Sequence, residues 1–404
     1  MSTSPVSFVS SRAPAAAHSR ISVTAAYAAQ GLGYAVVVTS LPLFKERYDV
    51  DDTAVALIVL LVCVMAACGS VVADLLAKWR GSRIALTVGL LLELGALLMI
   101  GTGLPFAFFI AGFALYGIGL GAVDAAGAMQ GVLVQRRYGR DIMGGYFAAS
   151  TGAAIIGALA VAGGSAVGLP EGAPLLLAAV VAGVAGVFGL RLFDRSRAAA
   201  PVGARSRAPL PRAGIWLFGF VILAAFTLDS AVSTWSTVYL HDDLLAVAAI
   251  APLGYAAYQG AVLVTRLVTD RATRRWGRMR VVAISTSVSI LGCLVVAFLP
   301  SVGAAIAGFA LAGVAVGALV PLAFTSAGAL TPARGDEVIA RVNLFNYAGA
   351  VLGAVLIGLL ADSPGLGLAF LLPAAALVGV LFVARRFRAP VPVAEDHVPA
   401  AAAR

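Results

Sequence analysis

The 404-residue chain is 61% hydrophobic and only 12% charged. A soluble domain is typically about 25% charged, so this composition excludes an ordinary cytosolic enzyme, a disordered chain and a secreted module. We assign the formal net charge of +9 to the short cytoplasmic loops of a multi-pass membrane protein, and we expect no nucleic-acid partner.

Twelve apolar runs are each long enough to cross the membrane as a helix, which takes about 20 residues for about 30 Å of hydrocarbon. Membrane strands are excluded because the runs are too long and do not alternate between apolar and polar residues. The sequence therefore predicts an all-α membrane protein. In chain order, the runs lie near 21–44, 53–77, 83–102, 105–134, 142–167, 174–193, 213–240, 246–269, 280–300, 302–330, 341–361 and 366–384.

Basic residues predict how these spans are oriented. If the N-terminus is cytoplasmic, the outside loops hold only Lys45 and Arg47, and the inside segments hold the other 26 of the 28 Lys and Arg residues. Positive charge collects on the cytoplasmic side, so we expect a bacterial cell (inner) membrane protein with both termini in the cytoplasm. His241, just past the seventh span, is expected to be a solvated loop residue.

The longest polar interruption, residues 194–212, is basic and Pro-rich and lies near the middle of the chain. These features are typical of a flexible cytoplasmic linker between two six-helix halves. The predicted division is a cytoplasmic tail over 1–20, a first bundle over 21–193, the linker over 194–212, a second bundle over 213–388 and a cytoplasmic tail over 389–404.

The loops after the second and eighth spans repeat one pattern. In residues 69–83 and again in residues 260–280, an acid lies seven residues before a glycine and basic residues surround the pair. The same loop at the same place in each half indicates two structural repeats. Transporters built from repeats place their substrate site at the repeat interface, near the middle of the membrane.

Together, the twelve spans, the basic central linker and the repeated loop resemble the major facilitator superfamily. The stretches 121–140, 229–240 and 254–278 are also similar to a narrower group, the bacterial YbjJ-like transporters, which are related to sugar permeases. The resemblance implies two pseudo-symmetric six-helix bundles and a central cavity lined by spans one, four, seven and ten. Span five lacks the Gly-Pro pair of drug/proton antiporters, which disfavours a multidrug exporter.

The resemblance also implies that the repeated loop helps to hold the two halves closed at the cytoplasmic face. Physically, an acid at a helix end can pair with an arginine and form a latch that opens. The alternative is a topological anchor with loose surface ion pairs, each contributing about 0–1 kcal/mol. The positions that match this cytoplasmic gate motif are Asp74, Arg83, Arg266, Asp270, Arg271, Gly277 and Arg278.

Three acids lie within apolar spans and are candidates for proton coupling: Glu93, Asp124 and Asp229. A charge at mid-bilayer costs at least about 2.5–3.5 kcal/mol, so such a residue needs a polar partner, water or a proton. Asp124 and Asp229 lie on spans four and seven, which line the cavity in the resembling family, whereas Glu93 lies on the peripheral span three. For each acid the alternative is a structural hydrogen bond between helices.

Several spans also carry hydroxyl, amide and aromatic side chains at helical spacing. This set suits an uncharged or weakly charged polar organic solute, although interhelical hydrogen bonds use the same residue types. The candidates for the substrate cavity are Tyr27, Gln30, Tyr34, Ser233, Trp235, Thr237, Tyr255, Gln259, Asn343 and Asn346.

The sequence carries no Walker loop, metalloprotease motif or nucleophile elbow, and its three cysteines lack metal-ligand spacing. We therefore expect no metal, no cofactor and no enzymatic activity. The predicted function is that of a monomeric secondary active transporter that moves a small polar organic solute by alternating access, coupled to protons. The alternatives are an efflux carrier for a drug-like or self-made metabolite and a carrier-like sensor that does not transport.

Overall fold

The computed structural model describes residues 12–138, 142–195, 210–331, 335–361 and 365–388, and these are helical with no strand. The expected all-α architecture is therefore confirmed. The helices of the first half are α1 (Arg12–Thr39), α2 (Leu41–Tyr48), α3 (Asp52–Arg80), α4 (Ser82–Gly101), α5 (Phe106–Tyr138), α6 (Met143–Ala166) and α7 (Ala173–Leu192).

The second half is likewise helical, with π-helical and 3-10 segments at some helix ends. Its longer helices are α8 (Arg212–Val238), α9 (Pro252–Trp276), α10 (Arg278–Phe298), α11 (Val302–Gly328), α12 (Gly335–Val351) and α15 (Leu371–Val383). The shorter segments are η1 (Tyr239–Asp243), η3 (Leu352–Leu356), α13 (Ile357–Leu359), α14 (Leu366–Ala369) and η4 (Ala384–Arg388).

Within the described residues, eleven helical stretches are long and apolar enough to span a membrane. The remaining expected span corresponds to α9, which has 25 residues but carries several charged side chains in its second half. Two predicted bounds were wrong. The first span ends at Thr39, because Pro42 opens the separate helix α2, and the eighth begins at Pro252 after a turn. Proline favours the first turn of a helix, which explains both starts.

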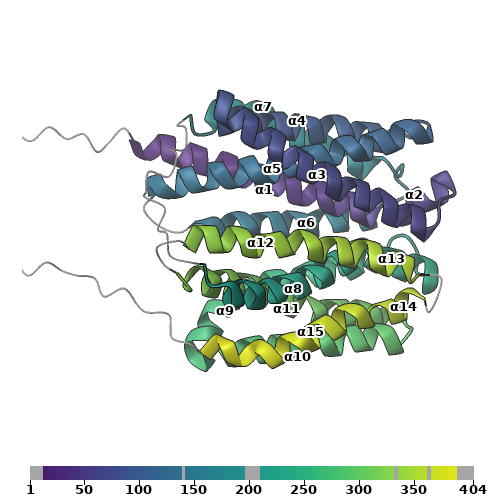
Figure 1. Cartoon of the computed structure of the whole chain (residues 1–404). Coiled ribbons are helices and arrows are strands. Elements are labelled where there is room, and N and C mark those ends of the chain that lie inside the picture. Colours follow the sequence, from purple (N-terminus) through teal and green to yellow (C-terminus); the bar gives the residue numbers. More distant parts are fainter. Residues whose placement is uncertain (1–11, 139–141, 196–209, 332–334, 362–364, 389–404) are drawn as a thin grey trace, which may run out of the picture.

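The helices form two bundles that lie side by side (Figure 1). Helices α1 to α7 lie in the upper part of the view and α8 to α15 in the lower part. The largest contact between the halves joins α6 to α9. The described start of α1 and the end of α15 lie at the same end of the molecule.

One turn occurs in the same place in both halves, as the sequence repeat predicts. Gly81 joins α3 to α4 with φ 92° and ψ 153°, and Gly277 joins α9 to α10 with φ 81° and ψ 152°. A Cβ added at either glycine would meet no atom within 4 Å, so space does not explain the residue. Only glycine adopts this backbone conformation readily, so the turn itself requires it.

Parts of the predicted division lie outside the described residues. These are 1–11 of the N-terminal tail, 196–209 of the linker and the whole C-terminal tail over 389–404. The residue bounds of the two six-helix halves, 21–193 and 213–388, stay a prediction.

Candidate functional site

Asp124 lies near the middle of α5 and is bound by an amide from α1. Gln30 Nε2 donates a hydrogen bond of 2.6 Å to Asp124 Oδ1. Gln30 is buried, whereas Asp124 is exposed. Asp124 also interacts electrostatically with Tyr347 on α12, in the other half. The neighbours of Asp124 therefore come from both halves.

The other central acid, Asp229, lies in the second half, on α8. The hydroxyl of Tyr258 on α9 donates to Asp229 Oδ1 at 2.7 Å. Arg266, two turns further along α9, interacts electrostatically with the same carboxylate. Asp229 is partly exposed. A carboxylate with both a hydroxyl donor and a guanidinium beside it can stay charged within the membrane.

Arg266 also connects the two halves directly. Its Nη1 donates a hydrogen bond of 2.8 Å to the hydroxyl of Thr151 on α6. The Thr151 hydroxyl in turn donates to the carbonyl of Phe147 at 2.9 Å, which orients its oxygen toward Arg266. The contact lies on the α6–α9 interface, so Asp229 is linked through Arg266 to the other bundle.

Tyr34 on α1 is near both acids. It interacts electrostatically with both Asp229 and Asp124, and it lies beside the hydroxyl of Ser233. Ser233 follows Asp229 by one helical turn on α8 and also lies beside Tyr255. The structure therefore brings together candidates from α1, α5, α8 and α9 around one space between the halves.

Aromatic and amide groups border this space on two sides. The ring of Tyr27 stacks on that of Tyr146 with centroids 5.5 Å apart, and it meets Phe147 edge to face at 5.6 Å. On α9, Gln259 Nε2 donates to the Tyr255 hydroxyl at 2.7 Å. Aromatic faces flanked by a few oriented polar groups are typical of sites for small organic molecules.

Glu93, on α4, lies apart from this group of residues. Its side chain is buried against α5, where a Cβ on Gly119 would come within 2.9 Å of the Glu93 Cγ. Its Oε1 has no hydrogen-bond partner among the described residues. Glu93 nevertheless interacts electrostatically with Asp124, which places the two carboxyls in the same half and near each other.

Other cavity candidates occupy different surroundings. Trp235 is fully buried, and its Nε1 donates to the carbonyl of Ala354 in η3 at 2.8 Å, a contact between helices. Thr237 is also buried, and its hydroxyl has no partner among the described residues. Asn343 and Asn346 are partly exposed on α12.

The residues assigned to the gate motif do not all lie together. Asp74 pairs with Lys78 on its own helix at 2.5 Å, and Arg83 donates to the carbonyl of Leu190 at 3.3 Å. Asp270, Arg271 and Gly277 are exposed, and Arg278 is partly exposed. Arg266 lies instead beside Asp229 and Thr151, away from the loop.

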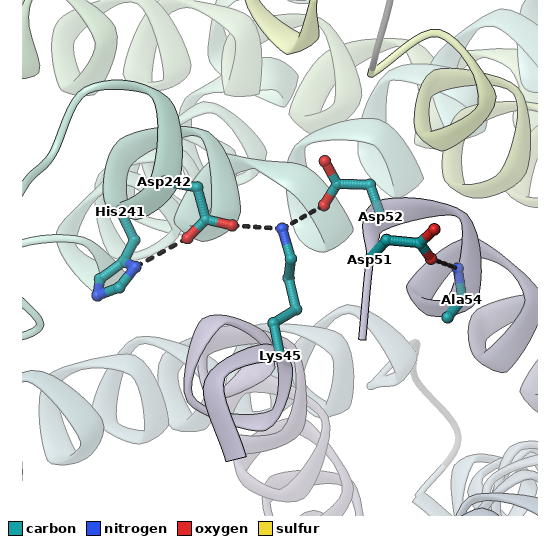
Figure 2. A network of polar contacts seen from close by, with 6 residues as sticks. All are labelled: Lys45, Asp51, Asp52, Ala54, His241 and Asp242. Carbon is teal, nitrogen blue, oxygen red and sulfur yellow. Dashed lines mark hydrogen bonds and ion pairs between the residues drawn. The ribbon is translucent and has the colours of Figure 1, made fainter. Parts of the chain in front are cut away.

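At the opposite end of the molecule, charged residues join the two halves (Figure 2). Lys45 on α2 lies between two carboxylates, Asp52 at the start of α3 at 2.5 Å and Asp242 in η1 of the second half. His241 lies 2.8 Å from Asp242 and 3.6 Å from Glu46, so it is not the solvated loop residue that the sequence suggested. We call these five residues the Lys45 network.

The carboxylates of the Lys45 network keep Lys45 in its charged form. Burial disfavours the charged form of Lys45, but the hydrogen bonds and charges of Asp242 and Asp52 outweigh burial and raise the Lys45 pKa above its ordinary value of 10.5. Lys45 therefore stays charged at neutral pH, and it holds α2 and α3 of the first half to η1 of the second.

Sequence reasoning missed the Lys45 network and the roles of Thr151 and Tyr258. A signal for the network was present, because Lys45 and Arg47 are the only basic residues in the predicted outside loops. No comparable signal marks Thr151, since a threonine in a helix is common and its partner Arg266 is 115 positions away. Within the described residues, no group of three His, Cys, Asp or Glu side chains could hold a metal ion.

Comparison with known proteins gives relatives along most of the chain. Residues 217–404 match the family model of the Major Facilitator Superfamily. An uncharacterised MFS-type transporter of Yersinia pestis is 28% identical over 87% of this chain and 91% of its own length. An uncharacterised transporter of Sinorhizobium fredii is 32% identical over 66% of this chain and 71% of its own length.

Solved structures of two transporters share the fold. A mutant of the nucleoside transporter NupG aligns over 92% of this chain and all of its own, with a TM-score of 0.74 and 14% identity. A bacterial homologue of the human lysosomal transporter Spinster, inward-facing and unoccupied, aligns over 93% of this chain and 96% of its own, with a TM-score of 0.66 and 14% identity. At these identities the likeness shows the fold alone.

Proposed function

This chain belongs to the Major Facilitator Superfamily and is a multi-pass membrane transporter, and we propose that it moves a small polar organic solute by alternating access, coupled to protons. The observation that supports the proposal most is the placement of Asp124 and Asp229. They come from different halves, and both interact with Tyr34 across the space between the bundles. The closer similarity to the YbjJ-like group stays a prediction.

Two features support a coupling role for these carboxyls. Each is bound by a side chain from another helix, Gln30 for Asp124 and Tyr258 for Asp229. Asp124 is also exposed and Asp229 partly exposed, so neither carboxyl is sealed off from protons. A proton shifts a conformational equilibrium only through different affinities in the two states, and partners on separate helices provide such a difference when the helices move.

The two ends of the molecule support alternating access. The Lys45 network holds the halves together at one end. At the other end, the acid of the first gate loop bonds within its own helix, and the matching acid of the second, Asp270, is exposed. We propose that the Lys45 end faces outward, that both chain ends are cytoplasmic, and that the chain acts as a monomer in the bacterial inner membrane.

Proton-flux measurements in liposomes test the proposal. Purified protein is reconstituted with pyranine inside, and a panel of hexoses, polyols and nucleosides is added outside in turn. We expect a solute-dependent pH change for at least one class, and we expect Asp124→Asn or Asp229→Asn to abolish it while solute binding remains. Asp49→Asn, which alters an exposed acid just after α2, is the matched control and should keep the flux.

Two outcomes of this experiment would contradict proton coupling. If solute enters the liposomes and the accompanying pH change is the same in wild type, Asp124→Asn and Asp229→Asn, then neither carboxyl couples transport to protons. Solute entry with no pH change in any variant contradicts proton coupling but leaves alternating access intact.

A further inference from the structure

A second polar site lies away from the space between the halves, at the ends of α1, α5 and α7. It is a cavity of about 390 Å³ whose lining includes His18, Arg137, Arg191, Asp194 and Arg195. His18 is the first residue of one membrane-spanning stretch, and the last residue of another, Leu192, also lines the cavity. The cavity, which we call the α1–α7 pocket, therefore lies at the membrane boundary.

Buried hydrogen bonds hold the wall of the pocket in place. Gln130, which is fully buried on α5, donates to the carbonyl of Asp194 at 3.0 Å and accepts from its backbone N–H at 2.9 Å. Ser19 on α1 donates to the carbonyl of Leu192 at 2.9 Å. The backbone that carries Arg191 and Arg195 is thus fixed from two neighbouring helices, so the pocket is a built feature of the first bundle.

The pocket carries more positive charge than its own acid can balance. Asp194 is fully buried and pairs with Arg137 at 2.8 Å. Arg191 and Arg195 are exposed and make no ion pair with any described residue. With His18 counted as neutral, the three arginines and Asp194 give the pocket a formal charge of +2. Arginine presents planar paired donors that match a phosphate group, so the pocket suits a phosphate anion.

The surroundings favour a phosphate that is attached to a lipid. On α1, Ile21 lies about one helical turn from His18 and is 65% exposed. On α7, Phe188 lies one turn from Leu192 and is 60% exposed. These apolar side chains face the hydrocarbon beside the charged pocket. A headgroup in the pocket would therefore place its acyl chains along exposed apolar surface, which a soluble phosphate would leave uncovered.

We propose that the α1–α7 pocket binds the phosphate headgroup of an anionic glycerophospholipid from the leaflet on the side of the chain ends. Arg191 and Arg195 hold the phosphate, and Arg137, oriented by Asp194, borders it. A bound lipid joins the start of α1 to the end of α7 and so fixes the first bundle at the point where the chain enters the linker. The site is separate from the space that contains Asp124 and Asp229.

Native mass spectrometry of the full chain, released from micelles with defined lipids, tests the proposal. Phosphatidylglycerol and phosphatidylcholine with identical acyl chains are the two probes. We expect wild type to retain phosphatidylglycerol preferentially and Arg191→Ala/Arg195→Ala to bind it about 30-fold more weakly. This factor corresponds to about 2 kcal/mol at about 1 kcal/mol for each arginine near an anionic lipid. Arg274→Ala/Arg275→Ala, which removes two exposed arginines from the end of α9, should keep wild-type binding.

Three results would overturn the proposal. Equal retention of the two lipids by wild type removes the headgroup preference, and this comparison needs no variant. An equal loss in both double variants shows diffuse attraction to the basic surface. In a separate arm, inorganic phosphate is added to lipid-free protein in detergent. If phosphate raises the unfolding temperature of wild type but not of Arg191→Ala/Arg195→Ala, the occupant is a soluble anion. None of these readouts depends on transport, so the proposed function is tested separately.

Discussion

Replacing Lys45 by glutamine should release the halves at the end where the Lys45 network holds them. Glutamine keeps much of the length of the side chain but removes the charge that lies between Asp52 and Asp242. The two carboxylates are then left without their shared cation. Since Asp52 belongs to the first half and Asp242 to the second, the substitution disfavours the conformation in which they are close together.

The magnitude follows from the one bond of Lys45 that crosses between the halves. Lys45 and Asp52 move together, so of these two Lys45 contacts only the one with Asp242 breaks when this end opens. A hydrogen bond to a charged group contributes about 1.5–3 kcal/mol and an exposed ion pair about 0–1 kcal/mol. The side chains of Lys45 and Asp242 are 14% and 28% exposed, so this pair is neither fully buried nor fully exposed. Its contribution should therefore lie between the two energies. We therefore expect about 1.4 kcal/mol, a tenfold shift toward the open state.

Spin-label distances measure this shift. Labels on cysteines at Leu104 in the first half and Val247 in the second, both exposed, report the separation at this end once the three native cysteines are replaced by serine. Arg47→Gln is the matched control, because Arg47 lies on the same helix but pairs with Glu171 within the first half at 2.6 Å. It should leave the distances unchanged. Identical distance distributions for wild type and Lys45→Gln would refute the reasoning.

Three further outcomes are expected. Alkali should weaken the network, because the Lys45 pKa is raised in the closed state. The contribution of the Lys45 charge is fully present below pH 10.5 and disappears as pH rises through the higher value, which the same label pair measures. Gly277→Ala should cost about 1–3 kcal/mol and lower the unfolding temperature, whereas Gly260→Ala, inside α9 and with nothing within 4 Å, should not. Thr151→Val removes the hydroxyl that accepts from Arg266 and should lower the unfolding temperature, whereas Thr151→Ser keeps this hydroxyl and should not. Equal effects of the two substitutions would show that the hydrogen bond between α6 and α9 contributes nothing to stability.

The helices could be predicted from the sequence because the membrane imposes a strict length on apolar runs. The same reasoning placed the repeated turn, since the acid-to-glycine spacing recurs and Gly81 and Gly277 share one backbone conformation. The bounds near Thr39 and Pro252 were harder. Both helices begin or end in apolar sequence, where hydropathy does not change and only a proline marks the boundary.

The partners within the site could not be predicted in the same way. Gln30 and Asp124 are 94 positions apart, and helical spacing within one span contains no information about which neighbouring helix it faces. For Trp235, the residue type suggested a cavity role that its hydrogen bond does not require. Its Nε1 donates to a backbone carbonyl of η3, where the π-helical turn alters the regular hydrogen bonding.

The two central acids differ in charge balance, and this difference assigns them different tasks. Arg266 interacts electrostatically with Asp229 and offsets its negative charge when no proton is bound. Asp124 has the neutral amide of Gln30, and no described cation pairs with it. An unbalanced carboxylate within the membrane must be neutralised by a proton or by a cationic group of the solute. A proton on either acid raises the net charge of the site by one. On Asp124 it removes a negative charge that has no paired cation, whereas on Asp229 it acts on Arg266 and, through Thr151, on the contact between the halves. In the liposome experiment, Asp124→Asn should thus remove the proton flux directly, and Asp229→Asn should remove it by freeing Arg266 from its counter-charge.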